Sequence, residues 1–124
     1  MVDATVYSDI GFYVGDISFV LNPKIYRAVF MSNGCKDGVY TINGYSIAVG
    51  ATVKRGGTVI DNNGFEYHVD AANIGIVPIE LIECGENVCG KLFCVPGEAD
   101  FICDSGIFRI SLPSDNEIII DTRY

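Results

Sequence analysis

Several features that mark common protein classes are missing from this chain of 124 residues. It has no tryptophan, one histidine and few charged side chains (19%). The longest apolar run without a charge covers only residues 74–79, whereas a membrane-spanning helix needs about 20 residues. Lysine and arginine are few (8, against 16 acids), so the net charge is −8. The sequence therefore predicts no membrane partner and no nucleic-acid binding through a basic face.

The N-terminus also lacks the pattern of a secretory signal peptide. No basic residue precedes the first apolar residues, and Asp3 and Asp9 interrupt them. We therefore expect a cytoplasmic protein. About half of the residues are apolar (49%), which excludes intrinsic disorder, a coiled coil and a collagen-like chain. The length predicts a single β-rich domain spanning residues 1–124.

Turn-forming residues recur about every 8–12 residues, and the segments between them alternate apolar and polar side chains. This spacing predicts an all-β, mainly antiparallel fold: a small sandwich or barrel of about 8–10 short strands. Asn43-Gly44 is a strong type I′ turn signal, and further hairpins are predicted around 61–64, 96–97 and 113–116. One predicted strand covers 12–16 and 18–21, with a break or bulge at Gly15. The other predicted strands cover 39–42, 45–49, 58–60, 65–69, 74–82, 92–95, 100–103, 107–112 and 117–121.

A short helix is predicted near residues 23–32. Asn22 is a favourable N-cap, and Pro23 at the first helical position lacks an N–H where no partner is needed. Asn33-Gly34 is a typical helix end. In the predicted strand 74–82, Pro78 indicates an edge position or a bulge. Both faces of this apolar strand must be covered by the chain or by a second copy, so a homo-oligomer is predicted, with tyrosines at its interface (Tyr7, Tyr13, Tyr26 and Tyr124).

Five cysteines are present, an odd number that leaves one thiol outside any closed set of disulfides. Besides Cys35, four of them lie within twenty residues as C-x4-C-x4-C-x8-C: Cys84, Cys89, Cys94 and Cys103. Zinc sites, disulfides and free thiols all remain open for this cluster, and buried or half-buried free thiols are favoured because C-x2-C pairs are absent. No metal site and no cofactor are predicted.

Two neighbouring segments carry the residues most suited to binding a ligand. Lys54, Arg55, Gly56 and Gly57 combine two cations with two glycines, whose N–H groups can form a nest for a phosphate or carboxylate. In the strand 65–69, alternation places Tyr67 on one side, and Glu66, His68 and Asp70 on the other. The predicted ligand-binding residues are Lys54, Arg55, Gly56, Gly57, Tyr67, His68 and Asp70.

Catalytic residues are not predicted. His68 with Asp70 or Glu66 is the one arrangement in the sequence that resembles a base with an orienting acid. The solvated face of a half-buried strand is the favoured interpretation of these residues. The phosphate-binding patterns G-x-x-x-x-G-K-[ST] and G-x-G-x-x-G are absent, as is the nucleophile pattern G-x-S-x-G. The chain is therefore expected not to be an enzyme.

Three blocks of the sequence resemble short uncharacterised proteins common in tailed phages and their hosts. Residues 14–21 (VGDISFVL) are similar to the family's GDPCYV opening, residues 67–72 (YHVDAA) to its Y-x-V-D-A-G block, and residues 74–81 (IGIVPIEL) to its V-P-x-E-L block. The closing segments 106–108 and 119–122 also resemble the family's ending. The resemblance implies a phage or mobile-element setting and a small β fold, and it supplies no catalytic residues.

The chain departs from that family at several positions. Ile17-Ser18-Phe19 stands where the family has Pro-Cys-Tyr, and Ala72 stands where it has glycine. The loop 54–58 lacks the family's Gly-Asp-Gly, and the cysteines of 84–103 lie outside the pattern. These thiols are therefore features of this chain rather than of the family.

These observations favour a non-catalytic, acidic binding protein encoded by a phage or mobile element. It would act in the host cytosol by binding and inhibiting a host factor of defence. One alternative is an oligomeric sponge that sequesters a small anionic, nucleotide-type signalling ligand through Lys54, Arg55 and the adjacent glycine amides. A second alternative is a structural component of the virion, and a third is an enzyme that uses His68.

Overall fold

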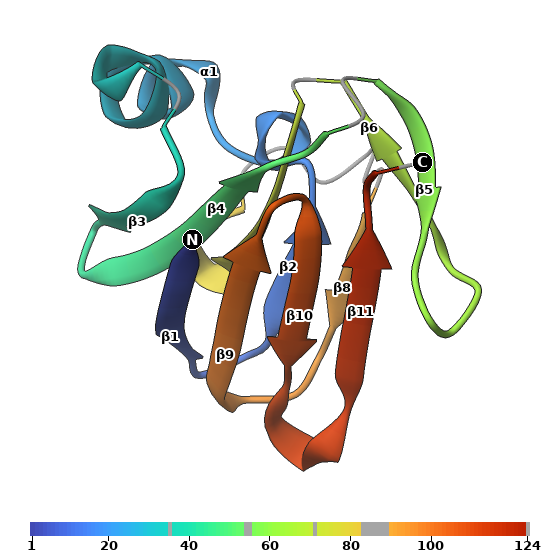
Figure 1. The fold of residues 1–124 in the computed structure, drawn as a ribbon. Coiled ribbons are helices and arrows are strands. Elements are labelled where there is room, and N and C mark those ends of the chain that lie inside the picture. The colour runs from blue at the N-terminus through green and yellow to red at the C-terminus, as the bar shows by residue number, and fades with distance from the viewer. Residues whose placement is uncertain (35, 54–55, 71, 83–89, 124) are drawn as a thin grey trace.

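A computed structural model describes the chain except for residues 35, 54–55, 71, 83–89 and 124 (Figure 1). The described residues form eleven strands, all paired antiparallel. The all-β class predicted from the turn spacing is confirmed. The strands are β1 (Val2–Ser8), β2 (Phe12–Gly15), β3 (Gly38–Ile42), β4 (Tyr45–Ala51), β5 (Gly57–Ile60), β6 (Glu66–Val69), β7 (Asn73–Pro78), β8 (Lys91–Phe93), β9 (Gly97–Asp104), β10 (Ile107–Ser111) and β11 (Glu117–Asp121).

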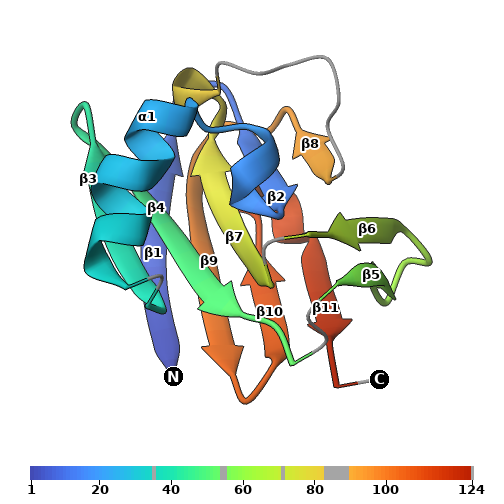
Figure 2. The same cartoon turned by 90° about the horizontal axis from the view of Figure 1, so that it is seen from above.

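The strands form two main sheets and one separate hairpin. The four-stranded sheet has the order β1-β9-β10-β11, the five-stranded sheet has the order β3-β4-β7-β2-β8, and β5 pairs with β6. The two main sheets lie face to face as a sandwich of open sheets (Figure 2). Their inner faces share one hydrophobic core, which contains Phe101, Phe108 and Ile110 from the first sheet and Phe12, Val14 and Ile76 from the second.

A helical segment covers the other face of the five-stranded sheet (Figure 2). It consists of α1 (Pro23–Ile25), a π-helical turn (Tyr26–Phe30) and a 3₁₀ turn (Met31–Asn33). As predicted, Asn22 caps it by accepting the amide of Lys24 (2.8 Å), and Gly34 ends it in the left-handed conformation (φ 74°). A second core lies under this segment, where Phe30 joins Ile47 and Val77. The molecule therefore has three layers, and the five-stranded sheet is the middle one.

The middle position explains the apolar strand β7. Ile74 and Ile76 belong to the core between the sheets, whereas Val77 belongs to the core under the helical segment. The chain itself thus covers both faces of this strand. The edge position or bulge predicted from Pro78 is wrong, because β7 lies between β4 and β2. The strand ends at Pro78, and a 3₁₀ turn (Ile79–Leu81) replaces the rest of the predicted strand.

Three hairpins are confirmed. Asn43 and Gly44 have positive φ (51° and 83°), as a type I′ turn requires, and they join β3 to β4. The hairpins β5–β6 and β10–β11 also form as predicted. The hairpin predicted around 96–97 is wrong: β8 pairs with β2 of the five-stranded sheet, whereas β9 pairs with β1 and β10. The segment 94–96 carries the chain from one sheet to the other.

Two other strand assignments also change. Residues 18–21, predicted as a strand, contain part of a 3₁₀ turn (Ile17–Phe19), because the buried Asp16 caps it through the amide of Ser18 (2.9 Å) and its hydroxyl (2.7 Å). Strand β1 was not predicted, although its exposed and buried positions alternate. No helix among the described residues has the length and apolar character needed to cross a bilayer.

The close contact of the two sheets depends on Gly50 in β4. A Cβ atom at this position would lie 2.4 Å from the Cys103 sulfur and 2.8 Å from the Phe108 ring. Both distances are shorter than any van der Waals contact, so only glycine lets β4 approach β9 and β10 this closely. The four-stranded sheet thus packs closely on the core with one face, and its other face meets solvent.

Candidate functional site

The β5–β6 hairpin brings together part of the ligand site predicted from the sequence. Gly57 pairs with Val69, and Thr58 pairs with His68. The exposed Gly56 and Gly57 therefore lie beside the exposed His68 and Asp70 at one end of the hairpin. Lys54 and Arg55, the two cations predicted for this site, lie outside the described residues.

Tyr67 does not belong to this surface. Its side chain is fully buried (0% exposed), and its hydroxyl donates to the Asp61 carboxylate at 2.7 Å. Burial and then this carboxylate raise the pKa of the tyrosine. The ring is therefore part of the core and does not belong to the surface on which the sequence predicted ligand-binding residues.

The environment of His68 offers little for catalysis. The imidazole lies near the Phe19 ring, and the two ring centres are 6.0 Å apart. Within the described residues, neither Glu66 nor Asp70 forms a hydrogen bond or an ion pair with it. The Asp70 amide donates to Asp16 (2.8 Å), so this N–H already has a carboxylate partner. The described part of the hairpin therefore presents an imidazole and carboxylates without an acid that orients the imidazole.

Two of the five cysteines lie within the described chain as free thiols. Cys94 is exposed and Cys103 is buried, while Cys35, Cys84 and Cys89 lie outside the described residues. No group of three potential metal ligands occurs among the residues described. Burial raises the pKa of Cys103 to about 11, and nearby carboxylates add to the shift.

We expect the two thiols to differ strongly in reactivity. At pH 8, a pKa of about 11 leaves roughly one thiolate in a thousand at Cys103. Iodoacetamide should therefore modify Cys94 within minutes and leave Cys103 unmodified until the chain is unfolded. Peptide mapping by mass spectrometry with and without denaturant measures both sites. Rapid modification of Cys103 in the folded protein would contradict its placement between the sheets.

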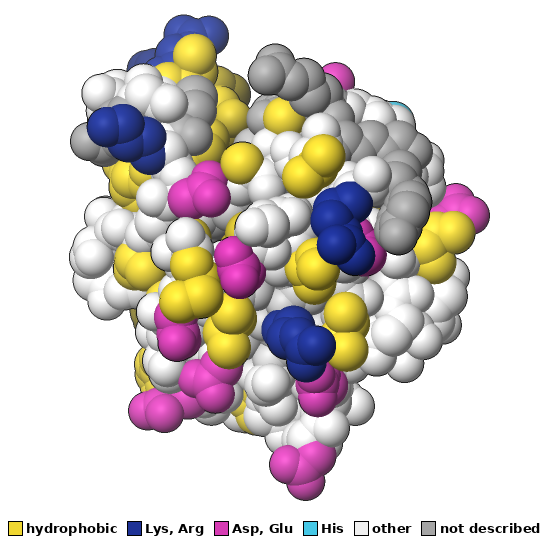
Figure 3. All heavy atoms as spheres, viewed as in Figure 1, with side chains coloured by type: hydrophobic (Ala, Val, Ile, Leu, Met, Phe, Trp, Pro, Cys, Tyr) yellow, Lys and Arg dark blue, Asp and Glu magenta, His cyan; other side chains and the backbone are white. Residues whose placement is uncertain are grey.

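A second candidate surface is the solvent-facing side of the four-stranded sheet, which we call the outer face. Figure 3 shows it toward the viewer, with acidic side chains gathered around apolar ones. Strand alternation sets its composition, since every second residue of each strand points outward. The outer face consists of Asp3, Thr5, Tyr7, Glu98, Asp100, Ile102, Asp104, Ile107, Arg109, Ser111, Glu117, Ile119 and Asp121.

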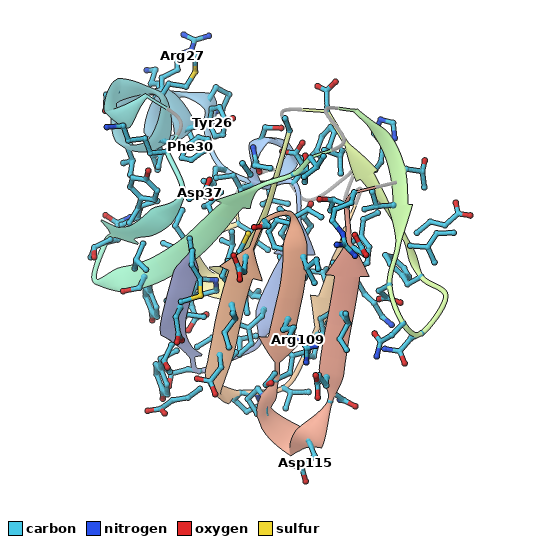
Figure 4. All side chains as sticks on the ribbon, in the orientation of Figure 1. Tyr26, Arg27, Phe30, Asp37, Arg109 and Asp115 are labelled. Carbon is cyan, nitrogen blue, oxygen red and sulfur yellow. The ribbon has the colours of Figure 1, made fainter. Side chains whose placement is uncertain are left out.

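Arg109 lies in the middle of the outer face (Figure 4). The cross-strand register puts it between Ile102 on β9 and Ile119 on β11, both half-buried. A hollow of about 220 Å³ beside it is lined by Met1, Ile102, Asp104, Ile107 and Arg109. Side chains in this arrangement form an apolar centre with one cation among them.

Carboxylates surround that centre. The four strands of the sheet carry six acids and a single base, Arg109. The nearest acid to Arg109 is Glu117, at 4.0 Å, and both side chains are more than half exposed (61% and 52%). Exposed pairs of this kind contribute about 0–1 kcal/mol. The guanidinium therefore remains solvated and accessible to a partner.

Asp121 is held differently from the other acids of the outer face. It accepts two hydrogen bonds from the Arg123 guanidinium (2.9 and 2.7 Å), and these bonds lower the pKa of its carboxyl. None of the other five acids accepts a pair of hydrogen bonds from one arginine in the described structure. The negative potential of the outer face therefore comes mainly from Asp3, Glu98, Asp100, Asp104 and Glu117.

The alternation of polar and apolar residues in the sequence is a signal that could have predicted this surface. In residues 97–104, Glu98, Asp100, Ile102 and Asp104 alternate with buried Ala99, Phe101 and Cys103. The predicted strand 100–103 was too short to show this pattern, and β1 was not predicted. Comparison of the chain with protein-family models, curated proteins and solved structures finds no match. Its function is therefore argued from this geometry.

Proposed function

We propose that this chain is a non-catalytic binding protein and that its outer face binds a basic surface of another protein. The observation that carries the proposal is the cluster of Ile102, Ile107 and Ile119 around Arg109, enclosed by carboxylates. Protein interfaces commonly combine an apolar centre and an arginine with a polar rim. The excess of acids favours a basic partner and speeds its approach.

Two outer faces would not bind each other well. Each carries six acids against one base, and like charges facing each other across an interface are destabilising. A different protein is therefore the better occupant of this surface. The homo-oligomer expected from the sequence remains a prediction, and it would have to use another surface.

The resemblance to phage proteins supports a more specific proposal. A small acidic protein made in an infected cell can block a host factor by occupying the basic surface with which that factor binds its own ligand. The virion alternative predicts instead that the chain is present in purified particles. The nucleotide sponge depends on Lys54 and Arg55, and it predicts an added mass of a few hundred daltons in native mass spectrometry.

Charge removal on the outer face is expected to weaken partner binding about tenfold. Asp3→Asn/Asp104→Asn removes two negative charges from this surface, and neither side chain forms a hydrogen bond that folding needs. Glu66→Gln/Asp115→Asn removes the same charge from the β5–β6 hairpin and from the β10–β11 turn, and it serves as the matched control. Host proteins retained by the wild type are identified, purified and titrated against all three proteins by calorimetry.

The same titration distinguishes the outer face from an effect of net charge. Equal weakening by both double variants would show that only the overall charge matters, and it would contradict the proposal. A second pair tests the apolar centre: Ile102→Asp should abolish binding, whereas Ile60→Asp, at an exposed isoleucine of the separate β5–β6 hairpin (55% exposed), should not. Retention of the partner by Ile102→Asp would also contradict the proposal.

A further inference from the structure

A groove runs along the free edge of the four-stranded sheet, where β1 faces the β3–β4 turn. Both ribbon views place this turn beside β1 (Figures 1 and 2). The groove has a volume of about 470 Å³, and its walls include Thr5, Tyr7 and Asp9 on one side and Tyr45 and Ser46 on the other. None of its described lining residues is basic.

Two aromatic rings and two carboxylates define the chemistry of the groove. Tyr7 is half exposed (49%), and its hydroxyl donates to the Asp9 carboxylate. Glu80 lies beneath Asp9, accepting the Asp9 amide at 2.9 Å and the Ser8 hydroxyl. Tyr45 approaches Glu80 from the β3–β4 turn. Aromatic faces and carboxylates both attract a cation.

The directions of three pKa shifts agree with a negative potential in the groove. The hydrogen bond to Asp9, together with the Asp9 charge, raises the pKa of Tyr7. Partial burial, followed by the charges of Glu80 and Asp9, raises the pKa of Tyr45. For Glu80, burial would raise the pKa, but the hydrogen bonds from Ser8 and the Asp9 amide outweigh it and lower the pKa. Glu80 therefore stays ionised at neutral pH.

We propose that this groove is a binding site for one guanidinium group, supplied as an arginine side chain by the protein that binds the outer face. An arginine suits the site better than a lysine, because its planar group stacks on tyrosine while its N–H fork meets a carboxylate. The identity of the donor rests on the proposed function. The preference of the groove for a cation rests on Tyr7, Tyr45 and Asp9, which line it. Glu80 adds a negative charge next to them.

The groove is continuous with the outer face. Thr5 lines the groove, and its hydroxyl donates to Asp100 at 2.8 Å. Tyr7 is paired across the strands with Glu98. A protein lying on the outer face would therefore reach the groove at the β1 edge without crossing any other element of the sheet.

The test uses N-acetyl-arginine methylamide as the probe and N-acetyl-citrulline methylamide, its uncharged isostere, as the control. Two-dimensional NMR of the ¹⁵N-labelled protein should show saturable shifts at Thr5, Tyr7, Asp9 and Tyr45. The citrulline probe should bind at least about tenfold more weakly, because a hydrogen bond between charged groups is replaced by a neutral one. Equal binding of the two probes would overturn the proposal.

Variants locate the site. Asp9→Asn keeps an acceptor for the Tyr7 hydroxyl and removes the charge, so arginine binding should weaken about fivefold. Asp115→Asn, in the β10–β11 turn, removes the same charge at a distance and should leave the affinity unchanged. Non-saturating shifts spread over all acidic positions would show only general charge attraction, and they would also overturn the proposal.

The experiment separates this inference from the proposed function. Asp3→Asn/Asp104→Asn should retain the arginine affinity, because neither residue lines the groove. Loss of the protein partner together with retained arginine binding in this variant supports both proposals. If this variant retains both the protein partner and the arginine affinity, the proposed function of the outer face is contradicted, whereas the groove is supported as an arginine site. If the wild type does not bind the probe, the groove fails.

Discussion

Replacing Phe108 with alanine is expected to lower the free energy of unfolding by about 4 kcal/mol. The Phe108 ring is fully buried between the two sheets, and its centre lies 5.8 Å from that of Phe101 in an edge-on arrangement. It also faces the close approach at Gly50, where no side chain is available to fill the cavity. Urea unfolding, followed by circular dichroism, measures the change.

Arg109→Ala is the control for this substitution, because Arg109 is the next residue on β10 and points to the opposite side of the sheet. Its loss should change stability by less than about 0.5 kcal/mol. A decrease below about 1.5 kcal/mol for Phe108→Ala would mean that the two sheets close over the cavity. That result would contradict a rigid packing of the two sheets around Phe108.

Asp16→Ala is expected to cost about 3 kcal/mol, since a buried carboxylate that accepts hydrogen bonds from two backbone amides is removed. Asp16 is fully buried, and it accepts the amides of Ser18 (2.9 Å) and Asp70 (2.8 Å). These bonds join the turn after β2 to the end of β6. Hydrogen exchange at the Asp70 amide should therefore become faster as stability falls.

Two matched variants test the role of the Asp16 carboxylate. Asp70→Ala leaves the bonded amide in place and removes an exposed side chain, so it should change stability by less than about 0.5 kcal/mol. Asp16→Asn keeps one acceptor oxygen and should fall between the wild type and Asp16→Ala. Equal stability of Asp16→Ala and the wild type would show that these amides find other partners.

Charge is segregated across the layers of the molecule. Residues 17–36 contain no acid, and they carry Lys24, Arg27 and Lys36, all exposed. Arg27 lies on the helical segment, far from Arg109 on β10 (Figure 4). The helical layer is thus positive and the outer face negative, with the five-stranded sheet between them. Such a distribution would orient the proposed basic partner toward the outer face before contact.

Local patterns accounted for much of the secondary structure. The turn at Asn43-Gly44 and the cap at Asn22 depend on residues next to each other in the chain, so the sequence predicted both. The hairpin predicted around 96–97 failed because β2 and β9 take their partners from distant segments. The strand predicted at 18–21 failed because Asp16, anchored to the Asp70 amide, caps a turn there.

Some of the residues predicted to bind a ligand do lie close together in the structure. Gly57 and His68 were predicted close together, and the β5–β6 pairing brings them there. Tyr67 was assigned to the same site, but strand alternation and the bond to Asp61 place it in the core. The outer face and the groove were not predicted, because each draws residues from distant parts of the chain. Thr5 and Asp100 of the outer face are 95 positions apart, and the groove joins residues 5–9 to residues 44–46.

The sequence by itself determined the all-β class, the acidic charge, and the turns and caps, because each depends on composition or on contacts between near neighbours. Only the tertiary structure decided which strands pair, which face of each sheet meets solvent, and where the charges gather. Pairing of β1 with β9 gathers Asp3, Asp100 and Ile102 onto one surface. Contacts between distant residues form only when burial of the shared core outweighs the entropy of closing the chain between them.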